Sequence, residues 1–263
     1  MENFVETSIE DGIGQVVLIR PDKRNALTRE MILQLQSGFD RLAKDESLRL
    51  ILFKAEGSVF CAGMDLGEMQ DRAKSDDGQA EWQKDSEVYA SCLKTIFEIE
   101  VPTIAVMQGP TLAGGVGMVL ACDFILASTE SFFMLPEPAR GITAAIVTPF
   151  LNFRVAPGVA NHLLLSGERM NANRALEIGM VYDVVDPNCL NARVDKLVHA
   201  ILTGSRSALT ITKSHLRYCL PFSLEQQLSQ SIRVSAAARE TEDAREGLAA
   251  FIEKRQPAWT PND

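Results

Sequence analysis

The stretch from Thr103 to Leu120 constrains the fold more than any other part of the sequence. A short apolar run, Thr103–Met107, leads into the glycine-rich segment Gln108–Gly117, and apolar residues follow. This pattern predicts a buried strand, a tight turn and a helix. Glycine lets the turn approach another group closely, and the first N–H groups of the helix favour negative charge. A plain turn between two core elements fits as well, whereas a dinucleotide fingerprint fits less because Leu120 replaces its third glycine.

Composition limits the classes of protein and of ligand. The chain has 263 residues, 46% of them hydrophobic, and a net charge of −9, which suits a sizeable core and disfavours nucleic-acid binding. Five cysteines without paired spacing indicate free thiols, and the sequence offers no cluster of metal ligands. We expect a cytoplasmic protein, because the N-terminus lacks a signal-peptide pattern and no apolar stretch is long enough to span a membrane.

Strands and helices alternate through the N-terminal half, which predicts an α/β core. Residues 3–20 are predicted to form two strands around a turn, the second of them buried on both faces. Thr28 is a predicted N-cap, and the helix after it buries one stripe: Ile32, Leu35, Phe39 and Leu42. Residues 48–54 form a predicted strand. The polar residues 70–88 are predicted to be a mobile segment that leads into a helix over 82–98.

The C-terminal half changes from mixed to helical structure. Short strands are predicted over 122–127 and 131–134, and helices over 143–155 and 159–166. Further helices are predicted over 187–203, 206–219, 223–238 and 241–254. We therefore expect a core over residues 1–200 and a helical region over residues 201–263.

Two further features suggest chemistry. Residues 56–69 repeat the order of strand, small-residue turn and helix start, and two such turns can aim backbone N–H groups at one point. Glu137 stands between Pro136 and Pro138, which are expected to hold its carboxylate in a rigid, non-helical setting. Apolar neighbours raise the pKa of such a carboxylate and suit it to proton transfer near neutral pH, although a surface loop position is the alternative.

In its order of motifs, the chain resembles the enoyl-CoA hydratase/isomerase (crotonase) superfamily over essentially its full length. The matching segments are Arg20–Pro21 with Asn25–Leu27, Phe60–Leu66, Gly109 with Ala113–Gly115, Cys122–Asp123, Pro136–Glu137 and Glu246–Arg255. Residues 138–150 are similar to bacterial methylglutaconyl-CoA-type hydratases. The resemblance implies an α/β crotonase (ClpP-like) spiral of β-β-α units. It also implies a helical C-terminal region that mediates a homotrimer or a dimer of trimers.

The same resemblance implies an acyl-CoA thioester as ligand, with no cofactor beyond the CoA of the substrate. It places the thioester carbonyl between the backbone N–H groups of Met64 and Gly114, where two donors would stabilise an enolate oxygen. Glu137 is implied as the acid/base. The implied substrate contacts come from Arg24, from the two turns and from the C-terminal helix: Arg24, Ala62, Met64, Asp65, Leu66, Gly67, Gly114, Phe251 and Lys254. Asp65 also suits an N-cap.

Gly117 is the main departure from the family, because hydratases of this family carry a second glutamate at that position. Three kinds of reaction stay open. Glu137 alone can isomerise a 3-enoyl-CoA, or another group or bound anion beside Gly117 can support hydration of a 2-enoyl-CoA. The third is different chemistry, such as thioester hydrolysis or decarboxylation. We favour hydration, by the weight of the family, then isomerisation, and keep a non-catalytic acyl-CoA-binding protein as a further alternative.

Overall fold

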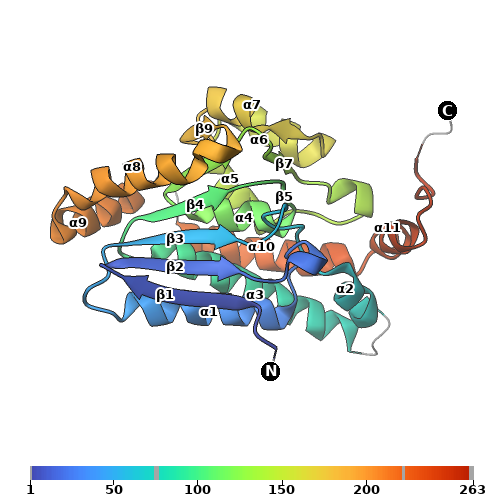
Figure 1. Cartoon of the computed structure of the whole chain (residues 1–263). Helices are drawn as coiled ribbons and strands as arrows, with labels where there is room; N and C mark the ends of the chain where they lie inside the picture. Colours follow the sequence, from blue (N-terminus) through green and yellow to red (C-terminus); the bar gives the residue numbers. More distant parts are fainter. Residues whose placement is uncertain (1, 74–76, 221–222, 261–263) are drawn as a thin grey trace.

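A six-stranded sheet forms the centre of the computed structural model, which describes residues 2–73, 77–220 and 223–260 (Figure 1). The strands, in spatial order, are β1 (Val5–Glu10), β2 (Ile13–Leu18), β3 (Leu50–Ala55), β4 (Thr103–Met107), β6 (Phe124–Ser128) and β9 (Asp183–Val185). β1 and β2 pair antiparallel, and the other neighbours pair parallel. A smaller sheet contains β5 (Thr111–Leu112), β7 (Phe132–Met134) and β8 (Met170–Asn171).

Helices connect the strands and complete the C-terminal part. The α-helices are α1 (Arg29–Ala43), α2 (Leu66–Ala73), α3 (Gly78–Glu98), α4 (Gly114–Ala121), α5 (Thr148–Asn152), α6 (Pro157–Asn161), α7 (Ala172–Glu177), α8 (Leu190–Leu202), α9 (Arg206–Tyr218), α10 (Leu224–Arg239) and α11 (Glu242–Ile252). Shorter helical turns are η1 (Pro21–Lys23), η2 (Pro138–Arg140), η3 (His162–Ser166) and η4 (Pro187–Cys189). This α/β architecture agrees with the predicted fold class.

The central sheet buries apolar side chains on both faces. Alternate residues of β3 and β4 point to opposite sides, because side-chain direction along a strand has a period of two. Leu50, Leu52 and Ile104 pack under α8, whereas Ile51 and Phe53 belong to the larger core that contains α1, α3 and α4. The sheet is thus the middle layer between α8 and the α1, α3 and α4 group (Figure 1).

The predicted cap and stripe of α1 are confirmed. The Thr28 hydroxyl accepts a hydrogen bond from the Met31 N–H at 3.1 Å, and the predicted apolar positions of the helix are buried. The prediction that β2 is buried on both faces is wrong, because its residues alternate between buried and half-buried. The reason is that α8 covers the sheet mainly over β3, β4 and β6.

The prediction that residues 70–88 become helical only from residue 82 is wrong where the structure describes them. Residues 74–76 lie outside the described part, and the mobility of the segment stays a prediction. Residues 70–73 belong to α2, and α3 already begins at Gly78. Three charged side chains of this segment, Arg72, Glu81 and Asp85, form ion pairs that connect α2, α3 and the start of α1.

The C-terminal helices follow the predicted pattern closely. The helix predicted over 143–155 shortens to Thr148–Asn152, because Pro149 is tolerated only in a first turn. α10 packs against α3, and α11 packs against η2 and α2. None of the helices in the described ranges combines the length and apolar character needed to cross a membrane. The boundary near residue 200 and the trimer stay predictions.

Candidate active site

Met64 and Leu27 form a short parallel bridge, and the Met64 N–H takes no part in its hydrogen bonds. Leu27 forms hydrogen bonds with the two residues that flank Met64. The Leu27 N–H donates to the Gly63 carbonyl at 2.8 Å, and the Leu27 carbonyl accepts from the Asp65 N–H at 2.9 Å. In a parallel bridge of this kind, the N–H of the middle residue, here Met64, points away from Leu27. Gly63 makes the turn possible with a φ of +87°, and a Cβ there would lie 2.6 Å from the Ala113 Cβ.

Gly114 is the first residue of α4, so its N–H has no carbonyl of an earlier helical turn to which it can donate. Ala113 precedes it with φ 49° and ψ −126°, an unusual conformation for a residue with a side chain. Such a conformation costs on the order of 1–3 kcal/mol, and the hydrogen bond from the Ala113 N–H to the Met134 carbonyl at 2.9 Å holds it. Within the described ranges, the N–H groups of Met64 and Gly114 have no hydrogen-bond partner.

Glu137 is a buried carboxylate with an unpaired oxygen. Its side chain is 7% exposed, and its Oε2 has no hydrogen-bond partner in the described structure. Burial raises the pKa of Glu137 to about 7, and a hydrogen bond from its own backbone, with the charges of Arg140 and Arg239, only partly offsets this effect. A carboxyl group with this pKa can both accept and donate a proton near neutral pH.

The prediction of a non-helical backbone at Glu137 is wrong. Glu137 has φ −54° and ψ −43°, which is helical backbone, although proline at the next position disfavours it. The Glu137 carbonyl accepts hydrogen bonds from the N–H groups of Arg140 at 2.9 Å and Ile142 at 3.2 Å, which stabilise the turn. α11 supports this turn from outside, since a Cβ on Gly247 would lie under 3.0 Å from the Arg140 backbone.

These groups share the wall of one cavity of about 70 Å³. Its lining residues come from α2 and the turn before it, from α3, from α4 and its N-cap, from α10, and from the segment after β7: Ala62, Met64, Leu66, Met69, Tyr89, Ala113, Gly114, Glu137, Arg140, Ile142, Thr143, Ala144, Ile146, Val147, Ser235 and Arg239. The wall is mainly apolar, and it includes the Glu137 carboxylate and the two residues, Met64 and Gly114, whose N–H groups are unused. Such a combination is typical of a ligand site.

Tyr89 fills the space beside Gly117. A Cβ on Gly117 would lie under 3.0 Å from the Tyr89 hydroxyl oxygen, so a larger residue has no room there. The buried Tyr89 hydroxyl donates a hydrogen bond to the Gly114 carbonyl. Burial, with smaller contributions from Cys61 and Glu137, raises the pKa of Tyr89 well above its usual value, so the hydroxyl stays protonated. The sequence pattern misses Tyr89, whose only signal is helical spacing from the buried Trp82 and Ser86.

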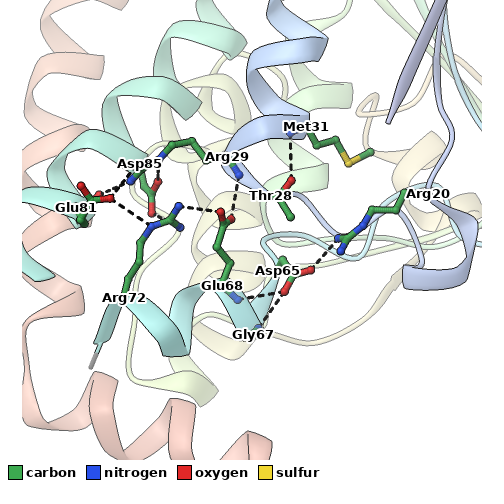
Figure 2. A network of polar contacts seen from close by, with 10 residues as sticks. All are labelled: Arg20, Thr28, Arg29, Met31, Asp65, Gly67, Glu68, Arg72, Glu81 and Asp85. Atoms are coloured by element: carbon green, nitrogen blue, oxygen red, sulfur yellow. Dashed lines mark hydrogen bonds and ion pairs between the residues drawn. The ribbon is translucent and has the colours of Figure 1, made fainter. Parts of the chain in front are cut away.

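A network of charged side chains connects α2 to α1 and α3 (Figure 2). Arg72 of α2 forms ion pairs with Glu68 at 2.8 Å and with Asp85 of α3 at 2.7 Å. Arg29 at the start of α1 binds the same Asp85 at 2.5 Å. The network therefore ties the helix that follows Met64 to the helix that carries Tyr89.

Asp65 is confirmed as the cap of α2. Its Oδ1 accepts from the N–H groups of Gly67 at 3.0 Å and Glu68 at 3.3 Å, and its Oδ2 pairs with Arg20 at 2.7 Å (Figure 2). Partial burial alone would raise the pKa of Asp65, but these bonds outweigh it and lower the pKa. Asp65 thus fixes the backbone next to Met64.

The other predicted binding residues lie around the cavity mouth and beyond it. Ala62 and Leu66 line the cavity, and the Ala62 N–H donates to the carbonyl of the exposed Arg24 at 3.0 Å. The Phe251 ring lies 4.4 Å from the Arg140 guanidinium, and Lys254 is exposed after α11. Neither of these two lines the cavity, so their contact with CoA stays a prediction.

The chain is similar to known proteins over almost its full length. The family model described as enoyl-CoA hydratase/isomerase matches residues 8–262. The chain is 32% identical to enoyl-CoA hydratase domain-containing protein 3, mitochondrial, from Mus musculus, over 98% of this chain and 84% of that protein. It is 28% identical to crotonyl-CoA hydratase from Syntrophomonas wolfei, over 94% of each. The crystal structure of an enoyl-CoA hydratase from Mycobacterium avium matches with a TM-score of 0.86, at 29% identity, over 99% of this chain and 100% of that one.

Proposed function

The chain belongs to the enoyl-CoA hydratase/isomerase family, and on this premise we propose that it is an acyl-CoA enzyme that works through a thioester enolate. The reaction that we propose is the hydration of a 2-enoyl-CoA. The observation that supports this proposal is Glu137, a buried carboxylate with an unpaired oxygen in a cavity that is also lined by Met64 and Gly114.

The proposed reaction needs one carboxylate and two N–H donors. The Glu137 carboxylate takes a proton from a water molecule as the water oxygen bonds to the β-carbon of the enoyl group. The electrons of the double bond move to the thioester oxygen, where the N–H groups of Met64 and Gly114 stabilise the negative charge. Glu137 then delivers the proton to the α-carbon, which gives the 3-hydroxyacyl-CoA and restores the carboxylate.

Tyr89 supports hydration despite the missing second glutamate. The Tyr89 hydroxyl already donates its hydrogen to the Gly114 carbonyl. Toward a further ligand, the hydroxyl oxygen can therefore only accept a hydrogen bond. A water molecule between Tyr89 and Glu137 could donate one hydrogen to each. In this proposal Tyr89 orients the water, and Glu137 performs the proton transfers.

Isomerisation of a 3-enoyl-CoA is the second candidate, and Gly117 is the observation that favours it. With one carboxylate on the described cavity wall, Glu137 could move a proton from the α-carbon to the γ-carbon without water. The intermediate would be the same enolate, held by the same two N–H groups.

Absorbance of the conjugated enoyl thioester separates the two reactions. Hydration of crotonyl-CoA removes this absorbance, whereas isomerisation of 3-hexenoyl-CoA creates it. We expect the purified protein to remove it from crotonyl-CoA. Tight binding of both thioesters without any change in absorbance would contradict the proposed enzyme and favour a binding protein.

A further inference from the structure

Met69 lies where the cavity meets two smaller hollows. Its side chain belongs to α2 and is 6% exposed. Met69 lines the cavity of about 70 Å³, and it also lines two neighbouring hollows of about 20 Å³ each. Trp82 of α3 lines both hollows but is not part of the cavity wall. Met69 therefore belongs to the wall that separates the cavity from the space beside Trp82.

Apolar side chains surround Met69 on both sides of this wall. Met69 packs with Trp82 and with Leu248 of α11 in one buried cluster. Leu66 and Ile142, which line the cavity, pack against the same cluster. The hollow between Trp82 and Leu248 has a mainly apolar surface. Because burial of apolar surface is favourable, a carbon chain that reaches this space gains binding energy.

Two of the described residues, Met69 and Arg239, line all three spaces. Arg239 is fixed by hydrogen bonds from its Nη1 to the Ser86 hydroxyl at 2.8 Å and to the Ser235 hydroxyl at 3.0 Å. Met69 has an unbranched side chain with three rotatable bonds, which is typical of a residue that fills irregular gaps. Met69 is therefore the residue whose size decides whether the three spaces are separate or continuous.

The volume of the cavity limits the acyl group that it can hold. One water-sized sphere takes about 10–15 Å³, so a cavity of about 70 Å³ has room for about five of them. A butyryl group has five heavy atoms, namely four carbons and the carbonyl oxygen. A chain of six or more carbons therefore needs space beyond the cavity.

We propose that Met69 determines the length of the acyl chain, because its side chain closes the cavity toward the space beside Trp82. This inference rests on the proposed function, since it takes the thioester to lie at Met64 and Gly114 and the acyl chain to occupy the cavity. In the wild-type protein, an acyl group of about four carbons fills the cavity. When the Met69 side chain is shortened, the cavity continues into the space beside Trp82, and a longer chain fits.

The binding of saturated acyl-CoA thioesters tests this proposal without turnover. Butyryl-CoA and hexanoyl-CoA share the CoA part and differ by two CH₂ groups, so the ratio of their Kd values reports the space for these groups. Titration calorimetry on the wild-type protein should give Kd values within about threefold of each other. Met69→Ala should bind hexanoyl-CoA about 10-fold to 20-fold tighter than butyryl-CoA, as expected for two buried CH₂ groups.

Two further variants separate the effect on chain length from a general loss of packing. Met170→Ala removes a methionine that is 5% exposed and lies outside the cavity wall, so it should keep the wild-type ratio. Met69→Val removes less of the side chain and should change the ratio in the same direction as Met69→Ala, by a smaller factor. Met69→Val decides the question if Met69→Ala fails to fold.

A wild-type protein that binds hexanoyl-CoA about 10-fold tighter than butyryl-CoA would overturn the proposal, because the space would already be open. An unchanged ratio in the folded Met69 variants would overturn it as well. The expected change of ratio without turnover of any enoyl-CoA would contradict the proposed reaction and leave this inference standing. Turnover of enoyl-CoA with an unchanged ratio would do the reverse.

Discussion

Replacing Glu137 by glutamine should stabilise the folded protein at pH 8 while it removes the acid/base. Glutamine has nearly the same shape and stays neutral, whereas burial raises the pKa of Glu137 from 4.5 to about 7. A carboxyl group with a raised pKa lowers the stability of the folded state as pH rises from the unfolded-state pKa to the folded-state pKa. Above that range, the folded protein bears the full cost of a buried charge.

The size of this effect follows from the pKa shift. At about 1.4 kcal/mol per pKa unit, the ionised Glu137 costs the folded state about 3 kcal/mol at pH 8 and about 1 kcal/mol at pH 5. The stabilisation by Glu137→Gln should therefore be about 2 kcal/mol larger at pH 8 than at pH 5. Any effect of the amide on packing or hydrogen bonding is the same at both pH values and cancels in this difference.

Urea unfolding, followed by tryptophan fluorescence at one protein concentration, measures the difference. Wild type, Glu137→Gln and the control Glu130→Gln should be compared at both pH values, since Glu130 is an exposed carboxylate. An equal stability change at pH 5 and pH 8 for Glu137→Gln would refute the reasoning, because it would mean that burial does not disfavour the charged form of Glu137.

Three other predictions concern the cavity. The kcat/KM for hydration should fall below pH about 7, because protonation removes the base form of Glu137, and a pH–rate profile measures this. Tyr89→Phe should lower the kcat of hydration about tenfold or more but leave α-hydrogen exchange within a few-fold, as followed by absorbance and mass spectrometry. Gly117→Ala should destabilise the protein by about 1–3 kcal/mol in urea, and much less when Tyr89 is alanine.

Each of these three has a contrary result. A flat profile between pH 5 and pH 8 would remove Glu137 as the base. Equal loss of hydration and exchange in Tyr89→Phe would make Tyr89 a structural residue instead of one that orients water. A Gly117→Ala cost that is the same in both backgrounds would show that Tyr89 does not occupy the space beside Gly117.

Local sequence patterns predict the caps, buried helix faces and turns that depend on residues close together in the sequence. The Thr28 cap and the buried stripe of α1 depend on residues within one or two helical turns, and both are present. Local pattern also predicts the two turns at Met64 and Gly114, because each segment shows the order of strand, small residues and helix start. The resemblance to a family then related them to one carbonyl oxygen.

The parts that sequence could not predict depend on contacts between distant segments. Tyr89 and Arg239 reach the cavity because α3 and α10 pack against each other and near the turn of Glu137. No local pattern marks either residue as part of the cavity wall. Glu137 itself has helical backbone against the local preference before proline, because hydrogen bonds to its carbonyl from Arg140 and Ile142 stabilise that conformation.

Exchange of the α-hydrogens of a saturated acyl-CoA tests the central claim most directly. Butyryl-CoA cannot be hydrated or isomerised, so deuterium uptake in D₂O reports only proton removal next to the thioester carbonyl. Mass spectrometry should detect uptake with the wild-type protein and a rate at least about 100-fold lower with Glu137→Gln. Exchange at the wild-type rate in Glu137→Gln, or none with a wild-type protein that binds the thioester, would contradict enolate chemistry at Glu137.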